Sequence, residues 1–185
     1  ASAVQGCGQF CTNPGLILGI ASPQMSAFVE QLRAHMAEQA PQTMLNAGTL
    51  ASYGKGLAAL HSHPGVSHLS GQPQSGNQAQ PQLFQADISL LLEHDELLQE
   101  EVFGPCTVVV LAADRKELLR AVRALQGQLT ATLLAEDADL VEFAELLPIL
   151  EQRVGRVLLN GYPTGVEVSD AMVHGGPYPA TSDAR

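Results

Sequence analysis

Apolar positions follow two spacings along the chain, and these spacings predict strands and helices in alternation. Continuous apolar runs at Leu16–Ile20 and Thr107–Leu111 are typical of buried strands. Further strands are predicted near Leu83–Gln85, at Leu129–Leu134 and at Val157–Asn160. Elsewhere apolar residues recur three and four positions apart, which places them on one face of a helix. The faces are Met25, Phe28, Val29, Leu32 and Met36; then Leu50, Tyr53, Leu57 and Leu60; and then Leu118, Leu119, Val122 and Leu125.

Residues that favour helix starts stand directly before these faces. Ser22, Asn46 and Asp114 are each suited to accept a hydrogen bond from the first helical turn. A further helix is expected to start at Asp137, and Pro148 should end or kink it.

Strands that alternate with helices predict an α/β fold with three layers, in which a largely parallel sheet carries helices on both faces. The whole chain, residues 1–185, is expected to form one domain. Gly71–Gln82 is rich in Gly, Pro, Gln and Ser and predicts an exposed loop. Asp87–Glu101 is acidic and, apart from Glu101, predicts a solvated surface.

Composition narrows the class of protein further. Nine basic against nineteen acidic residues give a formal net charge of −10, which disfavours binding to nucleic acid and to anionic membranes. The longest apolar runs are far shorter than a membrane span. Three cysteines, Cys7, Cys11 and Cys106, are too few for a disulfide scaffold and fit the reducing cytoplasm. The expected protein is therefore cytoplasmic.

The first segment that could carry chemistry is Gly8–Gly15, with the sequence GQFCTNPG. Cys11 stands there between glycine-rich, polar flanks and a strand, where backbone amides can point at a bound carbonyl oxygen. A thiolate in this position is a strong nucleophile toward aldehydes and acyl groups. The alternative is a buried structural cysteine, the role we assign to Cys106.

The second segment is Glu100–Pro105, with the sequence EEVFGP, immediately before the strand at Thr107–Leu111. Its carboxylates could hold sugar hydroxyls while Phe103 packs on a flat heterocycle. A solvated acidic end followed by an ordinary turn is the alternative.

In this order, the two segments resemble the nucleophile and cofactor-contacting segments of the aldehyde dehydrogenase superfamily. Gly155–Gly161 resembles the strand and loop that close the family's substrate tunnel, and residues 161–183 resemble one branch, the 2,5-dioxovalerate (α-ketoglutaric semialdehyde) dehydrogenases. The resemblance implies NAD(P)-dependent oxidation of a small aldehyde through a thiohemiacetal and a thioester on Cys11. It implies that Glu101 binds the nicotinamide ribose and that Phe103 packs near the nicotinamide.

The same resemblance assigns substrate contacts to Phe10, Thr12, Asn160 and Thr164, and no metal. In the family the general base and the dinucleotide-binding domain lie upstream of this segment, and an oligomerisation strand lies downstream. The chain is thus expected to be a catalytic-domain fragment of a homo-oligomer, in which NAD or NADP is bound mainly by the missing domain.

Other readings remain open at this point. Cys11 could act with His174 and Asn160 in a cysteine hydrolase or acyltransferase, or the chain could be a non-catalytic module. Cys7 could form a disulfide with Cys11, although a buried thiol is the simpler interpretation. The segment His61–His68 holds three histidines, which we expect to be exposed loop residues and not metal ligands.

Overall fold

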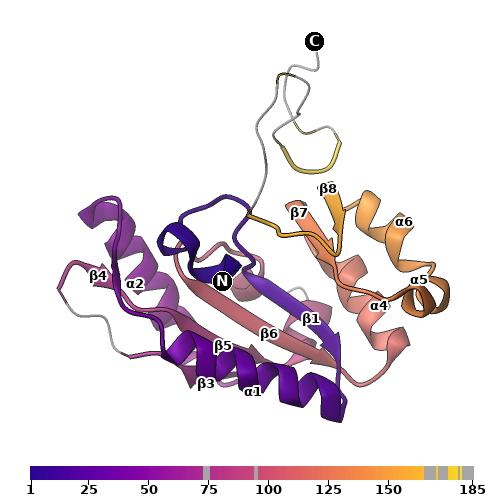
Figure 1. Cartoon of the computed structure of the whole chain (residues 1–185), viewed down its shortest axis with the longest axis horizontal. Helices are drawn as coiled ribbons and strands as arrows, with labels where there is room; N and C mark the ends of the chain where they lie inside the picture. The colour runs from indigo at the N-terminus through magenta and orange to yellow at the C-terminus, as the bar shows by residue number, and fades with distance from the viewer. Residues whose placement is uncertain (73–75, 94–95, 165–169, 171–174, 179, 181–185) are drawn as a thin grey trace.

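The fold is built on a four-stranded sheet with the order β1-β6-β5-β3 (Figure 1). The computed structural model describes residues 1–72, 76–93, 96–164, 170, 175–178 and 180. Strands β1, β6 and β5 run parallel, and β3 pairs antiparallel with β5 at the edge. The strands are β1 (Leu16–Ile20), β3 (Val66–Ser70), β5 (Gln82–Ala86) and β6 (Cys106–Ala112).

Alternate residues of these strands face two different helical layers. Leu83 and Val109 are fully buried against one helix, α1. Phe84, Val108 and Val110 point the other way, into a larger core to which several helices contribute. The predicted three-layer α/β arrangement is therefore confirmed. The helices are α1 (Pro23–Ala37) on the first face, and α2 (Ala47–Ser62), α3 (Ile88–Leu92) and α4 (Arg115–Ala124) on the second.

A second, two-stranded parallel sheet lies at the end of the molecule away from α2 (Figure 1). It pairs the strands predicted near residues 129–134 and 157–160, with bounds shifted toward the N-terminus. Asn160 lies just beyond the strand and takes a positive φ of 50°. The elements here are β7 (Gln128–Leu133), α5 (Asp137–Glu142), α6 (Leu146–Glu151) and β8 (Val154–Leu159).

The expected helix starts are confirmed by their hydrogen bonds. Ser22, Asn46 and Asp114 each accept a bond from the backbone N–H three residues on, at 3.1, 2.9 and 2.8 Å. The prediction for Pro148 was wrong in detail. The helix from Asp137 ends earlier, at Glu142, and Pro148 lies in the first turn of α6, where a helix needs no N–H donor.

The expectation of an exposed loop over Gly71–Gln82 was wrong in its second half. Gln78–Ala79 forms β4, which pairs with β2 (Gln42–Thr43), and the next residues are buried. Gln80 and Gln82 can be buried because their amides donate to the backbone carbonyls of Gln39 and Gln72, at 3.0 and 2.7 Å.

The acidic segment is also less exposed than expected, because Leu90, Leu91 and Leu98 are buried in the larger core. Two short 3-10 helices complete the described elements, η1 (Ser2–Gly8) and η2 (Glu96–Leu98). Among the described residues, every helix is too short or too polar to cross a membrane.

Two of the three clustered histidines belong to regular elements, in contrast to the predicted loop. His61 lies in the last turn of α2 and His68 on β3, with ring centroids 4.7 Å apart, and both rings contact Phe84. His68 also shares a 2.9 Å hydrogen bond with Gln82. The described residues contain no group of three or more side chains that could hold a metal ion.

This histidine pair predicts a loss of stability in mild acid. Partial desolvation and the neighbouring His68 lower the pKa of His61 below its ordinary value. The unfolded chain therefore binds this proton more readily, so stability is full above about pH 6.5 and falls as the pH drops below it. We expect His61→Gln to reduce the fall in the urea midpoint between about pH 7.5 and about pH 5.5.

The matched control is His35→Gln on α1, where the ring bonds only the exposed carbonyl of Gln31. It should leave the acid-induced change as it is in the wild type. An equal effect of both substitutions would contradict the assignment to the His61–His68 pair.

Candidate active site

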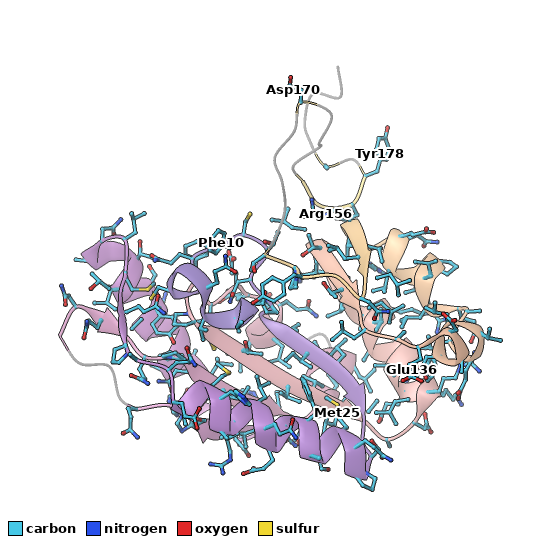
Figure 2. The ribbon with its side chains drawn as sticks, in the orientation of Figure 1. Phe10, Met25, Glu136, Arg156, Asp170 and Tyr178 are labelled. Carbon is cyan, nitrogen blue, oxygen red and sulfur yellow. The ribbon has the colours of Figure 1, made fainter. Side chains whose placement is uncertain are left out.

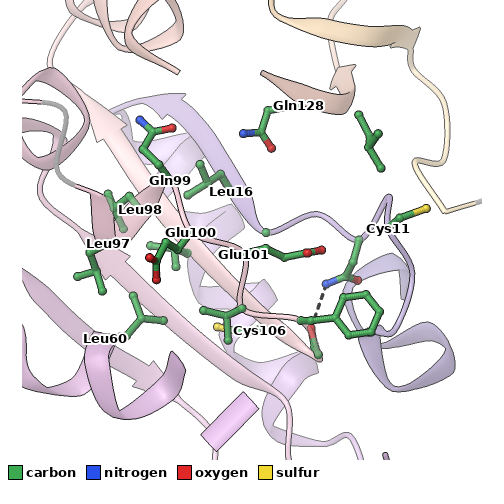
Figure 3. A pocket seen from close by; sticks show the side chains of 18 of the residues that line it. Cys11, Leu16, Leu60, Leu97, Leu98, Gln99, Glu100, Glu101, Cys106 and Gln128 are labelled. Carbon is green, nitrogen blue, oxygen red and sulfur yellow. Dashed lines mark hydrogen bonds between the residues drawn. The ribbon is translucent and has the colours of Figure 1, made fainter. Parts of the chain in front are cut away.

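A thiol, a carboxylate and an aromatic ring line one pocket of about 320 Å³. Cys11, Glu101 and Phe103 come from the two segments that the sequence singled out. The remaining walls include Leu16 at the start of β1 and Gln128 at the start of β7. Figure 3 shows the Glu101 carboxylate pointing toward the loop that carries Cys11. The Cys11 thiol lies at the edge of the set of side chains that line the pocket. The structure thus brings together residues 90 positions apart in the sequence.

The loop before Cys11 has a backbone that favours glycine. Gly6, Cys7 and Gly8 have φ angles of +56°, +60° and +63°, in the left-handed region. Gly8 is also in close contact with the second segment. A side-chain carbon there would lie 2.4 Å from the carbonyl carbon and oxygen of Gly104. Only a residue without a side chain allows the two backbones to approach this closely.

Tyr53 of α2 supports the second segment from behind. A side-chain carbon at Gly104 would lie 2.5 Å from the Tyr53 ring. The ring is 1% exposed, and its hydroxyl lies 2.9 Å from the carbonyl oxygen of Gln80 and 3.3 Å from that of Pro105. Burial raises the pKa of Tyr53 far above its ordinary value, so the hydroxyl stays protonated and donates. Tyr53, Gly104 and Gly8 therefore form a stack of three layers.

The loop that carries Cys11 also contacts the segment before α2, through Cys7 and Gln9. Cys7 is 2% exposed, and its thiol contacts Met44 Sδ at 3.3 Å. Burial raises the pKa of the Cys7 thiol. Gln9 Oε1 accepts a 2.8 Å bond from the backbone N–H of Leu45. These contacts support the interpretation of Cys7 as a buried thiol.

The three cysteines differ in accessibility, and this difference decides which can react. Cys11 is exposed, whereas Cys7 and Cys106 are buried, and none of them is in a disulfide. Burial raises the pKa of Cys106 to about 12. A thiolate is therefore disfavoured at Cys7 and Cys106, and Cys11 carries the accessible thiol among the three.

Glu101 combines solvent access with partial desolvation. Neighbouring protein raises the pKa of its carboxyl above the ordinary value, although the side chain as a whole is exposed. Phe103, two residues on, is half-buried in the same wall. A carboxylate and a ring so placed have the chemistry to bind sugar hydroxyls and a flat heterocycle, which is what one end of a nicotinamide nucleotide requires.

The four residues predicted to contact substrate are not among the residues that line this pocket. Phe10 is 38% exposed and packs on Gly6, on the opposite side of the molecule from Met25 (Figure 2). Thr12 is buried. The roles assigned to both residues stay predictions.

Asn160 and Thr164 have structural partners. The Asn160 amide bonds both the N–H and the carbonyl of Ala135, at 3.0 and 2.8 Å, and so ties β8 to the end of β7. The Thr164 hydroxyl bonds the side chains of Ser2 and Gln5. Substrate binding by these two residues stays a prediction. In the alternative of a cysteine hydrolase, Asn160 would have to give up its hydrogen bonds to Ala135 in order to orient His174. His174 lies outside the described residues.

Three residues important for the geometry were not assigned to the site from the sequence. The two glycines, Gly8 and Gly104, stood inside the motifs, but spacing does not indicate that they touch. Tyr53 was predicted only as part of an apolar helical face. Its hydroxyl on an otherwise apolar face was the available signal, since a buried tyrosine usually finds a hydrogen-bond partner.

Comparison with known proteins shows the family of the chain. A family model described as "Aldehyde dehydrogenase family" matches residues 1–177. The chain belongs to the aldehyde dehydrogenase family. Two similar curated relatives are an alpha-ketoglutaric semialdehyde dehydrogenase of Acinetobacter baylyi, 54% identical over 187 residues, and alpha-ketoglutaric semialdehyde dehydrogenase 2 of Azospirillum brasilense, 42% identical over 184 residues. The matches cover 100% and 98% of this chain but only 36% and 35% of those relatives.

Solved structures of aldehyde dehydrogenases share the fold. The glyceraldehyde-3-phosphate dehydrogenase GapN of Methanocaldococcus jannaschii, in complex with NADP, superposes with a TM-score of 0.74 at 16% identity, over 97% of this chain and 39% of that one. ALDH21 of Physcomitrella patens, in complex with succinate, gives 0.71 at 18% identity, over 95% of this chain and 36% of that one. This level of identity supports the aldehyde dehydrogenase fold and nothing finer.

The contact between Gly8 and Gly104 predicts a large effect of one methyl group. Gly8→Ala adds a carbon where there is no room, whereas Gly76→Ala adds one at a similar φ of +60° with nothing within 4 Å. Both variants carry the left-handed penalty of roughly 1–2 kcal/mol. We expect Gly8→Ala to lose about 1–3 kcal/mol more free energy of unfolding, from overpacking. Urea denaturation of the chain measures both, and equal losses would contradict the close contact.

Proposed function

We propose that the protein containing this chain oxidises an aldehyde to a carboxylic acid with NAD or NADP, and that the aldehyde is α-ketoglutaric semialdehyde (2,5-dioxopentanoate). The observation that carries the proposal is the shared pocket of Cys11, Glu101 and Phe103. The names of the two relatives at 54% and 42% identity support the choice of substrate. The chain spans about a third of their length, so the activity is assigned to the whole protein.

Cys11 performs the first chemical step. Its thiolate attacks the aldehyde carbon, a carbon–sulfur bond forms, and the carbonyl π electrons move to the oxygen. The tetrahedral thiohemiacetal that results carries negative charge on this oxygen. The backbone N–H of Cys11 donates to the oxygen and stabilises the charge as it develops.

Collapse of this intermediate expels the hydrogen of the former aldehyde carbon with its bonding electrons. NAD(P)⁺, when bound, supplies the acceptor for this hydride. Cys11 then holds the acyl group as a thioester, and attack by water on the thioester carbon releases the carboxylic acid and regenerates the Cys11 thiolate. A base supplied by the rest of the protein takes the proton of this water.

Glu101 and Phe103 orient the end of the cofactor that reacts. The Glu101 carboxylate would accept hydrogen bonds from ribose hydroxyls, and the Phe103 ring would pack beside the nicotinamide. Both side chains share the pocket with Cys11, so the contacts hold the acceptor next to the acyl-forming carbon. The role is chiefly one of orientation, because the greater part of the dinucleotide would be bound by other parts of the protein.

The remaining expectations concern the whole protein. Residues 1–185 would act as its catalytic domain, with the dinucleotide-binding part and the general base supplied by sequence outside these residues. Assembly into a homo-oligomer and residence in the cytoplasm complete the proposal. The small number of cysteines, three in 185 residues, supports a reducing compartment.

The test is a dehydrogenase assay of the full-length protein. We expect 2,5-dioxopentanoate to reduce NAD⁺ or NADP⁺ more efficiently than pentanal, which lacks the carboxylate. Cys11→Ser should lower turnover more than about 100-fold with cofactor binding retained, because a hydroxyl is a far weaker nucleophile than a thiolate. Cys7→Ala, on the buried side of the loop, should keep most of the turnover. Absence of reduced cofactor with every aldehyde would overturn the proposal.

A second prediction concerns Glu101. Glu101→Gln should slow hydride transfer about 10-fold or more while cofactor affinity changes less, because the carboxylate orients the ribose. Single-turnover formation of reduced cofactor measures the step directly. The matched control is Glu100→Gln, which removes the same charge one residue earlier and should have a smaller effect. Equal rates of hydride transfer in wild type and Glu101→Gln would show that Glu101 has no role in orienting the cofactor.

A further inference from the structure

We propose that Asn13 is a positioning residue that couples two loops. One is the loop that carries Cys11, residues 8–15 (the nucleophile loop), and the other is the loop that carries Glu101 and Phe103, residues 100–105 (the cofactor-contacting loop). The inference rests on the proposed function, since it gives each loop a role in one reaction. Asn13 stands two residues after Cys11, and its side chain reaches the segment that carries Glu101 and Phe103. It lines the same pocket as these three residues.

The coupling consists of one directed hydrogen bond. Asn13 Nδ2 donates to the carbonyl oxygen of Gly104 at 3.2 Å, shown as the dashed line in Figure 3. Gly104 directly follows Phe103. The bond therefore joins a residue next to the nucleophile to a residue next to the cofactor contact, across a separation of 91 positions in the chain.

The orientation of the amide is fixed by its partner. The Gly104 carbonyl can only accept, so the NH₂ group must face it. The opposite atom, Asn13 Oδ1, is buried and has no hydrogen-bond partner. A buried acceptor without a donor costs folding free energy. Asn13 is therefore a poor choice for stability alone, and local choices that oppose stability are expected where function needs them.

The lower part of the loop is held independently of Asn13. The Thr107 hydroxyl donates to the carbonyl of Pro14 at 3.0 Å, and the Val108 N–H donates to that of Gly15 at 2.8 Å. These bonds fix the chain as it enters β1. Removing the Asn13 amide should thus leave the fold and the Gly8–Gly104 contact intact, and loosen only the placement of Cys11 relative to Phe103 and Gly104.

The two kinds of chemistry at Cys11 depend differently on this relation. Alkylation by iodoacetamide needs only the thiol. Hydride transfer needs the thiol-bound carbon and the oriented cofactor together, and a displacement of about 1 Å in such a pair can cost up to about 100-fold in rate. The ratio of the two rates therefore reports the coupling and not the general integrity of the loop.

The experiment compares Asn13→Ala with wild type in the full-length protein. We expect single-turnover hydride transfer to fall about 10- to 100-fold, while the rate of Cys11 alkylation changes less than about twofold. The urea midpoint should be unchanged or slightly higher, because the unsatisfied oxygen is removed along with the bond. A fall in the midpoint together with equal losses in both rates would show a merely structural role and overturn the proposal.

The matched control is Gln9→Ala. It removes the bond to Leu45 and a 3.2 Å bond to the Gly6 carbonyl, both in the same loop but neither to the Gly104 turn. It should change alkylation and hydride transfer by the same factor. If both variants show the same ratio as wild type, Asn13 does not couple the loops. Failure of the proposed function is seen separately, as a wild-type protein that reduces no cofactor.

Discussion

The close approach of two backbones, at Gly8 and Gly104, is the constraint on which the rest of the site depends. It joins a loop at the start of β1 to a turn at the start of β6, and these two strands are neighbours in the central sheet. Parallel strands with aligned register, Leu16 opposite Val108, bring the two loops to one edge. The absence of side chains at the two glycines then lets the loops touch.

Buried side chains behind this contact, Tyr53 and Cys7, hold the two loops in place. Tyr53 fills the space behind Gly104, and its hydroxyl donates to the carbonyl of Gln80, with the carbonyl of Pro105 also within reach. Cys7 occupies the equivalent space under the nucleophile loop, against Met44. Each loop is thus supported by a buried side chain, and the thiol of Cys11 is left accessible at the surface between them.

The regular elements were predictable from the sequence because their signals are local. Caps at Ser22, Asn46 and Asp114 and the apolar helical faces depend only on neighbouring residues. The errors arose where burial depends on distant partners. Polar residues such as Gln80 and Gln82 looked exposed by composition, yet distant backbone carbonyls satisfy them. The two motifs indicated the thiol, the carboxylate and the ring that line the pocket. The contact of Gly8, Gly104 and Tyr53 behind them could be seen only in the three-dimensional arrangement.

The most direct test of the account is to follow activity and thiol modification together in the full-length protein. Timed treatment with iodoacetamide, followed by peptide mass mapping, gives the extent of alkylation at each cysteine. The account predicts that dehydrogenase activity falls in proportion to alkylation of Cys11, while Cys7 and Cys106 stay unmodified. Activity that survives complete alkylation of Cys11, or that falls in step with modification of a buried thiol, would contradict it.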